Sequence, residues 1–159
     1  YYNRFKNLID FDEGPPPILV NRSKVTVKGF ELIGDVSPWD PLTLSGSVTY
    51  ADSNIEGTDE ELRNRPKWFG GFSVEFRPDR SLSMVLDAVF AGKVNDSSIP
   101  TGDVVLDSYT ALDFTATWTP SPNVSVFLAV ENLLNAEYEQ YIGFPAPGIS
   151  PRAGLRLTY

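Results

Sequence analysis

PLTLSGSVTY (residues 41–50) and WFGGFSVEFR (residues 68–77) alternate apolar and polar side chains with a period of two. SLSMVLDAVF (residues 81–90) and YTALDFTATW (residues 109–118) follow the same pattern. Successive side chains of a β-strand point to opposite sides, so this alternation predicts strands with one apolar and one polar face. The four segments are therefore predicted to be strands of one sheet.

Four further segments have the character of strands, at residues 1–11, about 19–36, 123–132 and 149–159. The chain is therefore predicted to be all-β, an antiparallel up-and-down meander of about eight strands. Only turns and loops are expected between the strands, because no amphipathic helix of useful length can be found in the sequence.

The connections between these strands come in two sizes, which alternate along the chain. The short ones are SPWDP (37–41), RPDR (77–80) and TPSPN (119–123), and they carry the residues of tight turns. The long ones lie near residues 12–18, 51–65, 92–107 and 133–148. Alternate connections of a meander share one end of the sheet, so one end is predicted to carry tight turns and the other long loops. This segregation is typical of outer-membrane barrels, with short periplasmic turns and long extracellular loops.

Aromatic residues on the apolar face fall into two bands. Tyr50, Trp68 and Phe90 are placed at the long-loop end, whereas Phe76, Trp118 and Tyr159 are placed at the tight-turn end. The bands are separated by about the 9–11 residues that a transmembrane strand needs. These six residues are therefore predicted to form the lipid-facing aromatic girdles of a membrane barrel. The alternative is aromatic filling of the core of a soluble β-sandwich.

The composition of the 159 residues restricts the function classes. The net charge of −8 argues against nucleic acid as a partner, because phosphate binding needs a basic face. The sequence contains neither cysteine nor histidine, so it lacks thiolate and imidazole ligands and the usual general base. Neither an enzyme activity nor a cofactor is therefore expected.

Three stretches together resemble the C-terminal part of a TonB-dependent outer-membrane receptor. The first is YYNRFKNLIDF (1–11) followed by NRSKVTVKGFELIG (21–34), with a KGFE-type signature at residues 28–31. The second is VENLLNAEYEQYIGFPAPG (130–148), in which Asn132, Leu133, Asn135 and Tyr138 match the pattern NL-x-(D/N)-x-x-Y. The third is the ending PGISPRAGLRLTY (147–159). The three motifs occur in order and at compatible spacing, and the resemblance covers essentially the whole chain.

The resemblance implies that residues 1–159 are the last eight strands of a 22-stranded transmembrane barrel. It implies a location in the bacterial outer membrane and TonB-energised uptake of a scarce nutrient. That nutrient is expected to be a ferric siderophore or similar iron complex, with cobalamin as another candidate. The expected partners are membrane lipid, the nutrient–metal complex at the extracellular loops, and TonB through an N-terminal plug domain that residues 1–159 do not include. The alternatives are a complete small eight-stranded membrane barrel and a soluble β-sandwich binding protein.

Five residues are candidate ligand contacts. Arg63 and Arg65 precede Trp68 and could bind an anionic ligand by charge, or could simply form the base of a loop. Tyr138, Tyr141 and Phe144 lie in the last long loop, and the alternative for them is packing within that loop. Glu75, Asp87 and Asp113 lie on adjacent strands. We favour the interpretation that they are polar groups of a barrel wall over the interpretation that they are paired carboxylates of the glycosidase type.

The last strand carries Leu155, Leu157 and Tyr159 on its apolar face, with Arg152 and Arg156 on the other. In the family that the chain resembles, a terminal aromatic residue after alternating apolar residues is read by the barrel-assembly machinery. The three apolar residues are therefore predicted to be this assembly signal, and Tyr159 is expected to be the natural terminus.

Overall fold

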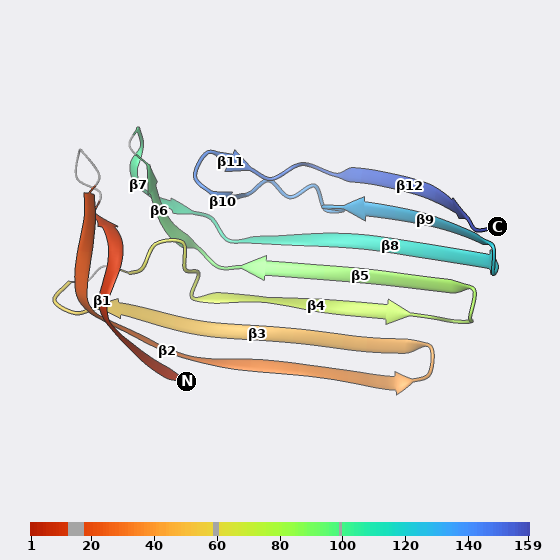
Figure 1. Cartoon of the computed structure of the whole chain (residues 1–159), viewed down its shortest axis with the longest axis horizontal. Helices are drawn as coiled ribbons and strands as arrows, with labels where there is room; N and C mark the ends of the chain where they lie inside the picture. Colours follow the sequence, from red (N-terminus) through yellow and green to blue (C-terminus); the bar gives the residue numbers. More distant parts are fainter. Residues whose placement is uncertain (13–17, 59–60, 99) are drawn as a thin grey trace.

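The computed structural model describes residues 1–12, 18–58, 61–98 and 100–159 of the chain, and their main feature is one eight-stranded sheet. Its strands pair in the order β1-β2-β3-β4-β5-β8-β9-β12, and each pair is antiparallel (Figure 1). The strands are β1 (Tyr2–Asp12), β2 (Ile18–Trp39), β3 (Leu42–Ile55), β4 (Trp68–Phe76), β5 (Leu82–Ala91), β8 (Tyr109–Ser121), β9 (Val124–Glu131) and β12 (Ser150–Leu157). The predicted all-β meander of eight strands is confirmed.

The sheet is open, because β1 and β12 form its two edges. The described strands therefore do not close into the small eight-stranded barrel that the sequence left as an alternative. The three tight turns lie at one end of the sheet with the C-terminus, and the long connections lie at the other (Figure 1). None of the described residues belongs to a helix of the length and apolarity needed to cross a membrane.

The expectation that only turns and loops join the strands is wrong at two of the long connections. Within 92–107, β6 (Val94–Ser98) and β7 (Gly102–Leu106) form a hairpin, and within 133–148, β10 (Glu139–Tyr141) pairs with β11 (Phe144–Pro145). Gly102 and Gly143 adopt φ values of 66° and 80° in the two turns, a conformation that favours glycine. The two hairpins are too short for the period of two to be recognised in the sequence.

The strand β3 is longer than predicted, and β2 and β3 extend beyond the rest of the sheet at the long-loop end. The expected loop near 51–65 begins only after Ile55, and residues 59–60 of it lie outside the described residues, as do residues 13–17 of the loop near 12–18. Val25 on β2 pairs with Ile55 on β3, and these side chains are 0% and 3% exposed. Burial of this apolar pair explains why β3 continues past its predicted boundary.

Two neighbouring rungs of the sheet, each a row of register partners across successive strands, show how strictly the apolar and polar faces are separated. One rung runs through Val36, Leu44, Val74, Leu86, Phe114 and Val130, all apolar. The rung one residue away runs through Asp35, Ser45, Ser73, Asp87 and Asp113, all polar. The apolar face is called the outer face below and the polar face the inner face.

Apolar side chains of the outer face remain uncovered. Leu32, Phe72 and Leu155 are 62%, 49% and 63% exposed. Among the described residues the buried apolar side chains are only Val25, Ile55 and Ala111, and no second layer of described residues packs on the outer face (Figure 1). A sandwich would bury this face in its core, so the arrangement favours an apolar environment supplied from outside the chain.

The predicted aromatic bands lie on this outer face. At the long-loop end the rings of Tyr50 and Trp68 are 4.8 Å apart, and Phe30 joins them at 5.9 Å from Tyr50 and 5.7 Å from Trp68. Phe90 is the register partner of Gly70, where a Cβ atom would lie 2.9 Å from the Phe90 ring. Phe76 and Trp118 lie near the tight turns, and Tyr159 follows the end of β12 there. Leu155 and Leu157 continue the outer face as partners of Val126 and Val124. Contact of these residues with lipid stays a prediction.

Candidate functional site

A hollow on the inner face lies at the long-loop end of the sheet. It has a volume of about 1060 Å³ and is open on one side. A single rung of Glu31, Thr49, Phe69, Ala91 and Tyr109 crosses this region, and all of these residues except Thr49 line the hollow. Arg65 and Asn64 line it from the β3–β4 connection. The hollow therefore combines aromatic and aliphatic walls with one cation and one carboxylate, a mixture that suits an amphipathic small molecule.

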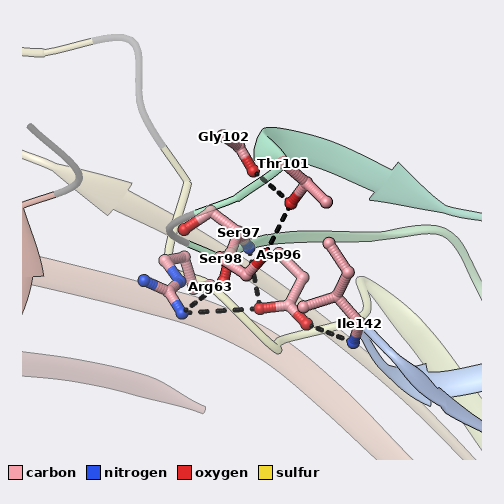
Figure 2. Close-up of polar contacts among 7 residues, drawn as sticks. All are labelled: Arg63, Asp96, Ser97, Ser98, Thr101, Gly102 and Ile142. Carbon is pink, nitrogen blue, oxygen red and sulfur yellow. Dashed lines mark hydrogen bonds and ion pairs between the residues drawn. The ribbon is translucent and has the colours of Figure 1, made fainter. Parts of the chain in front are cut away.

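Above the sheet, Asp96 joins three long connections (Figure 2). Its side chain is only 4% exposed and lies on β6. Oδ1 accepts hydrogen bonds from Nη2 of Arg63 at 3.4 Å and from the backbone N of Ser97 at 2.8 Å. Oδ2 accepts one from the backbone N of Ile142 at 2.8 Å, in the β10–β11 turn. The β3–β4 connection, the β6–β7 hairpin and the β10–β11 hairpin are thus held together through one carboxylate.

The two candidate arginines occupy different environments. Arg63 is held by Asp96 and by the carbonyl oxygen of Ser97, so its charge stabilises the contact between connections. Arg65 lines the hollow instead. Arg65 thus borders the hollow, and Arg63 ties the connection that carries Arg65 to β6; ligand contact by either arginine stays a prediction.

The three aromatic candidates, Tyr138, Tyr141 and Phe144, also lie in different environments. Tyr138 stacks on Tyr109, with ring centroids 4.0 Å apart and an interplanar angle of 11°. Burial raises the pKa of the Tyr138 phenol, and the neighbouring Tyr109 and Asp113 raise it further. Tyr138 thus supports a wall residue of the hollow, because Tyr109 lines that hollow. Tyr141 and Phe144 lie on the β10–β11 hairpin and are 55% and 72% exposed.

The Asn-Leu motif at the end of β9 has a direct structural explanation. Asn132 and Asn135 both adopt a φ of 49°, in the left-handed region that asparagine tolerates better than most residues. Asn132 is 5% exposed, and its amide donates to the carbonyl oxygens of Ala136 (2.9 Å) and Pro147 (3.0 Å) while accepting from Ala136 N (2.8 Å). Oδ1 of Asn135 accepts from Ile149 N at 3.0 Å. The motif therefore fixes both ends of the connection from β9 to β12.

We expect Asn132→Ala to loosen this connection in the full-length protein. The substitution removes three hydrogen bonds of a buried amide and places alanine at a positive φ, a combined cost of roughly 2–4 kcal/mol. Hydrogen exchange followed by mass spectrometry should show at least about tenfold faster exchange across residues 133–149. Asn132→Gly is the matched control, because glycine tolerates the backbone and isolates the loss of the hydrogen bonds. Unchanged exchange in both variants would contradict this role for Asn132.

The carboxylates of the inner face do not form one cluster. Glu75 is paired with Arg77 at 2.6 Å, which agrees with the favoured interpretation of these carboxylates as polar groups of a barrel wall. Asp87 and Asp113 are register partners, and Oδ1 of Asp113 accepts a hydrogen bond from Asn132 N at 2.8 Å. Within the described part of the chain, no group of three or more acidic, cysteine or histidine side chains is arranged to hold a metal ion.

Sequence reasoning missed Asp96 and Phe30. Asp96 is one of many loop acids, and no local signal distinguishes it from its exposed neighbours. Phe30 did carry a signal, since it shares its parity with Leu32 on β2 and could have been included in the aromatic band.

Comparison with known proteins gives a consistent result. The family model for the TonB-dependent receptor-like β-barrel matches residues 1–133. The ferripyoverdine receptor of the outer membrane of Pseudomonas aeruginosa is 13% identical, with a TM-score of 0.77 over 98% of this chain and 24% of that one. The siderophore receptor PiuA from Acinetobacter baumannii is 22% identical, with a TM-score of 0.77 over 99% and 25%. The copper transporter OprC is 15% identical, with a TM-score of 0.80 over 99% and 27%.

The chain spans about a quarter of the length of these solved structures. No curated protein matches the sequence.

Proposed function

Because the chain belongs to the family of TonB-dependent receptor β-barrels, we propose that residues 1–159 form part of the barrel wall of an outer-membrane uptake receptor. The cargo is a ferric siderophore or a similar iron complex, with cobalamin as the second candidate. The solved structures with this fold support a metal-complex cargo, since two are siderophore receptors and one is a copper transporter. The receptor works as a transporter and not as an enzyme.

The separation of the two sheet faces is the observation that carries this proposal. The outer face meets lipid between the two aromatic bands, and the inner face meets the water-filled or plugged lumen. Along β3, Leu42 and Tyr50 are separated by about 27 Å at roughly 3.4 Å per residue. At a strand tilt of about 40° this corresponds to about 21 Å across the membrane, close to the apolar band of about 25 Å in outer-membrane barrels. The tight turns face the periplasm and the long loops face the exterior.

The partners follow from this orientation. The metal complex reaches the receptor through the long loops and meets the hollow lined by Arg65 and Tyr109. TonB acts through a plug domain that residues 1–159 do not include. The barrel-assembly machinery recognises the last strand through Leu155, Leu157 and Tyr159.

Uptake of ⁵⁵Fe bound to a catecholate or hydroxamate siderophore tests the function in the bacterium that carries the complete receptor. Deleting the receptor should reduce uptake of one such complex at least about tenfold, and deleting TonB should have the same effect. A deletion strain that imports each iron complex and cyanocobalamin at the wild-type rate would contradict the proposal.

Equilibrium binding of the same ⁵⁵Fe–siderophore complexes to the complete receptor tests the hollow. Arg65→Ala should weaken binding of an anionic ferric siderophore about five- to tenfold, because a charged hydrogen bond contributes roughly 1.5–3 kcal/mol before solvent screening. Arg80→Ala is the matched control, since Arg80 lies in the tight turn at the opposite end of the sheet. Equal affinities of the two variants would remove Arg65 from the ligand site.

A further inference from the structure

The hollow on the inner face contains two charged side chains of opposite sign. Glu31 on β2 and Arg65 on the β3–β4 connection both line it. The other described residues that line it have uncharged side chains, and several of them, such as Phe5, Phe69 and Val89, are apolar. The hollow is therefore a largely apolar surface with one anion and one cation in its wall.

Neither of these two charges is neutralised by the part of the chain that the structure describes. Within it, no cation lies within 4.0 Å of the Glu31 carboxylate, and no carboxylate lies within 4.0 Å of the Arg65 guanidinium. The neighbouring Arg63, in contrast, is held by Asp96. Glu31 and Arg65 are thus available to charged groups of a ligand.

The strand register and the path of the β3–β4 connection keep the two charges apart. Glu31 lies two strands away from Phe69 in the same rung, which is about 10 Å at roughly 4.8 Å per strand. Arg65 precedes Phe69 on the connection that enters β4. The backbone N of Asn64 donates to the carbonyl oxygen of Asn95 at 2.9 Å, which holds this connection beside β6 and away from β2. A ligand lying over Phe69 therefore meets the two charges at different points of its surface.

A ligand that fills the hollow removes water from both charges. Removing water from an unpaired carboxylate or guanidinium is unfavourable unless the ligand supplies a group of opposite charge that forms a hydrogen bond. A ligand with anionic groups alone pairs with Arg65 but is repelled by Glu31. A ligand that has both an ammonium and a carboxylate pairs with each of them.

We propose that the hollow selects a zwitterionic iron complex, in which a cationic group pairs with Glu31 and a carboxylate pairs with Arg65. The aliphatic chains of the complex lie over Phe69 and the other apolar residues of the wall. Glu31 is then a specificity-determining residue, because its charge disfavours strongly anionic complexes such as ferric tris-catecholates. This inference rests on the proposed function, and it adds the charge class of the cargo.

Three ferric trihydroxamates that differ only at their chain ends test this charge selection. Ferrioxamine G carries a free ammonium and a free carboxylate, ferrioxamine B carries the ammonium alone, and N-acetylferrioxamine B carries neither. Binding of each ⁵⁵Fe complex to the purified complete receptor in detergent should weaken in this order. Each step should be at least about fivefold, because each lost charge removes a charge-assisted hydrogen bond.

Substitutions at the two charges should each abolish one of these steps. Glu31→Gln should bind ferrioxamine B and N-acetylferrioxamine B with nearly equal affinity, and Arg65→Gln should do the same for ferrioxamine G and ferrioxamine B. Glu31→Gln should also bind the triply negative ferric enterobactin at least about threefold more tightly than wild type, because a like charge is removed. The matched control Asp87→Asn removes an exposed carboxylate of the inner face outside the hollow and should keep both steps.

Wild-type receptor that binds the three trihydroxamates equally, or binds none of them, would overturn the charge selection. Both steps retained in Glu31→Gln and Arg65→Gln would overturn its assignment to this hollow. Iron uptake by the deletion strain, measured separately, keeps the two proposals distinguishable. If that strain imports every complex at the wild-type rate while the purified receptor shows both steps, the transport proposal fails and the charge selection stands. If uptake requires the receptor but neither substitution changes the order of binding, only the charge selection fails.

Discussion

Leu86→Arg is expected to destabilise the receptor in the membrane. Leu86 lies between Val74 and Phe114 in an all-apolar rung, about halfway between the two aromatic bands. An arginine at the bilayer midplane on the lipid face of a barrel costs roughly 2–4 kcal/mol. Refolding of the complete receptor into phosphatidylcholine vesicles, titrated with urea, should show a loss of stability of this size.

The matched control is Ser73→Arg, one rung away on the inner face. Ser73 is the register partner of Asp87, so the introduced guanidinium meets a carboxylate and water instead of lipid. We expect this variant to lose less than about 1 kcal/mol. If both variants refold with the same stability, the assignment of the outer face to lipid is wrong.

Asp96→Ala is expected to separate the three long connections that Asp96 joins. The substitution leaves the N–H of Ile142 without its acceptor and leaves the Arg63 guanidinium without its buried partner. Removing the carboxylate from this group of hydrogen bonds and its ion pair is expected to reduce the free energy of unfolding by roughly 1–3 kcal/mol. This value is low for a buried ion pair because Arg63 is partly exposed. Hydrogen exchange of the complete receptor should then become at least about tenfold faster at Ile142 and across β6 and β7.

The ligand affinity of Asp96→Ala should fall together with this loosening, because Arg63 positions the connection that carries Arg65. Asp103→Ala is the matched control, since Asp103 is an exposed acid on the same hairpin. Asp96→Asn should be intermediate, because it retains an acceptor for Ile142 but loses the charge opposite Arg63. Faster exchange without any change in ligand affinity would show that the joined loops do not contribute to binding.

Much of this sheet could be predicted from residues that lie next to one another in the chain. The alternation of apolar and polar side chains predicted four strands and the residues on each of their faces, within 41–50, 68–77, 81–90 and 109–118. The missed parts were the extension of β3 and the two hairpins. Val25 and Ile55 explain the first miss, because their burial depends on a pairing between distant parts of the sequence.

The candidate site was predicted less completely than the fold. Arg63 and Arg65 are both predicted ligand contacts; Arg65 lines the hollow, Arg63 contacts Asp96, and ligand binding by either stays a prediction. The ring of Tyr138, another predicted ligand contact, stacks on Tyr109, and its contact with a ligand stays a prediction. The motif that contains Asn132 can be recognised in the sequence. Only the hydrogen bonds in the structure show that the amide of Asn132 holds the β9–β12 connection in place.

The sequence alone determined the fold class, the two faces, the aromatic bands and the family resemblance, since these depend on a local period of two and on short motifs. Only the tertiary structure decided which loops meet at Asp96, which aromatic ring lines the hollow, and which two charges share its wall. The reason is strand register. A shift of one residue between neighbouring strands leaves every local pattern intact, yet it moves every cross-strand contact to the other face.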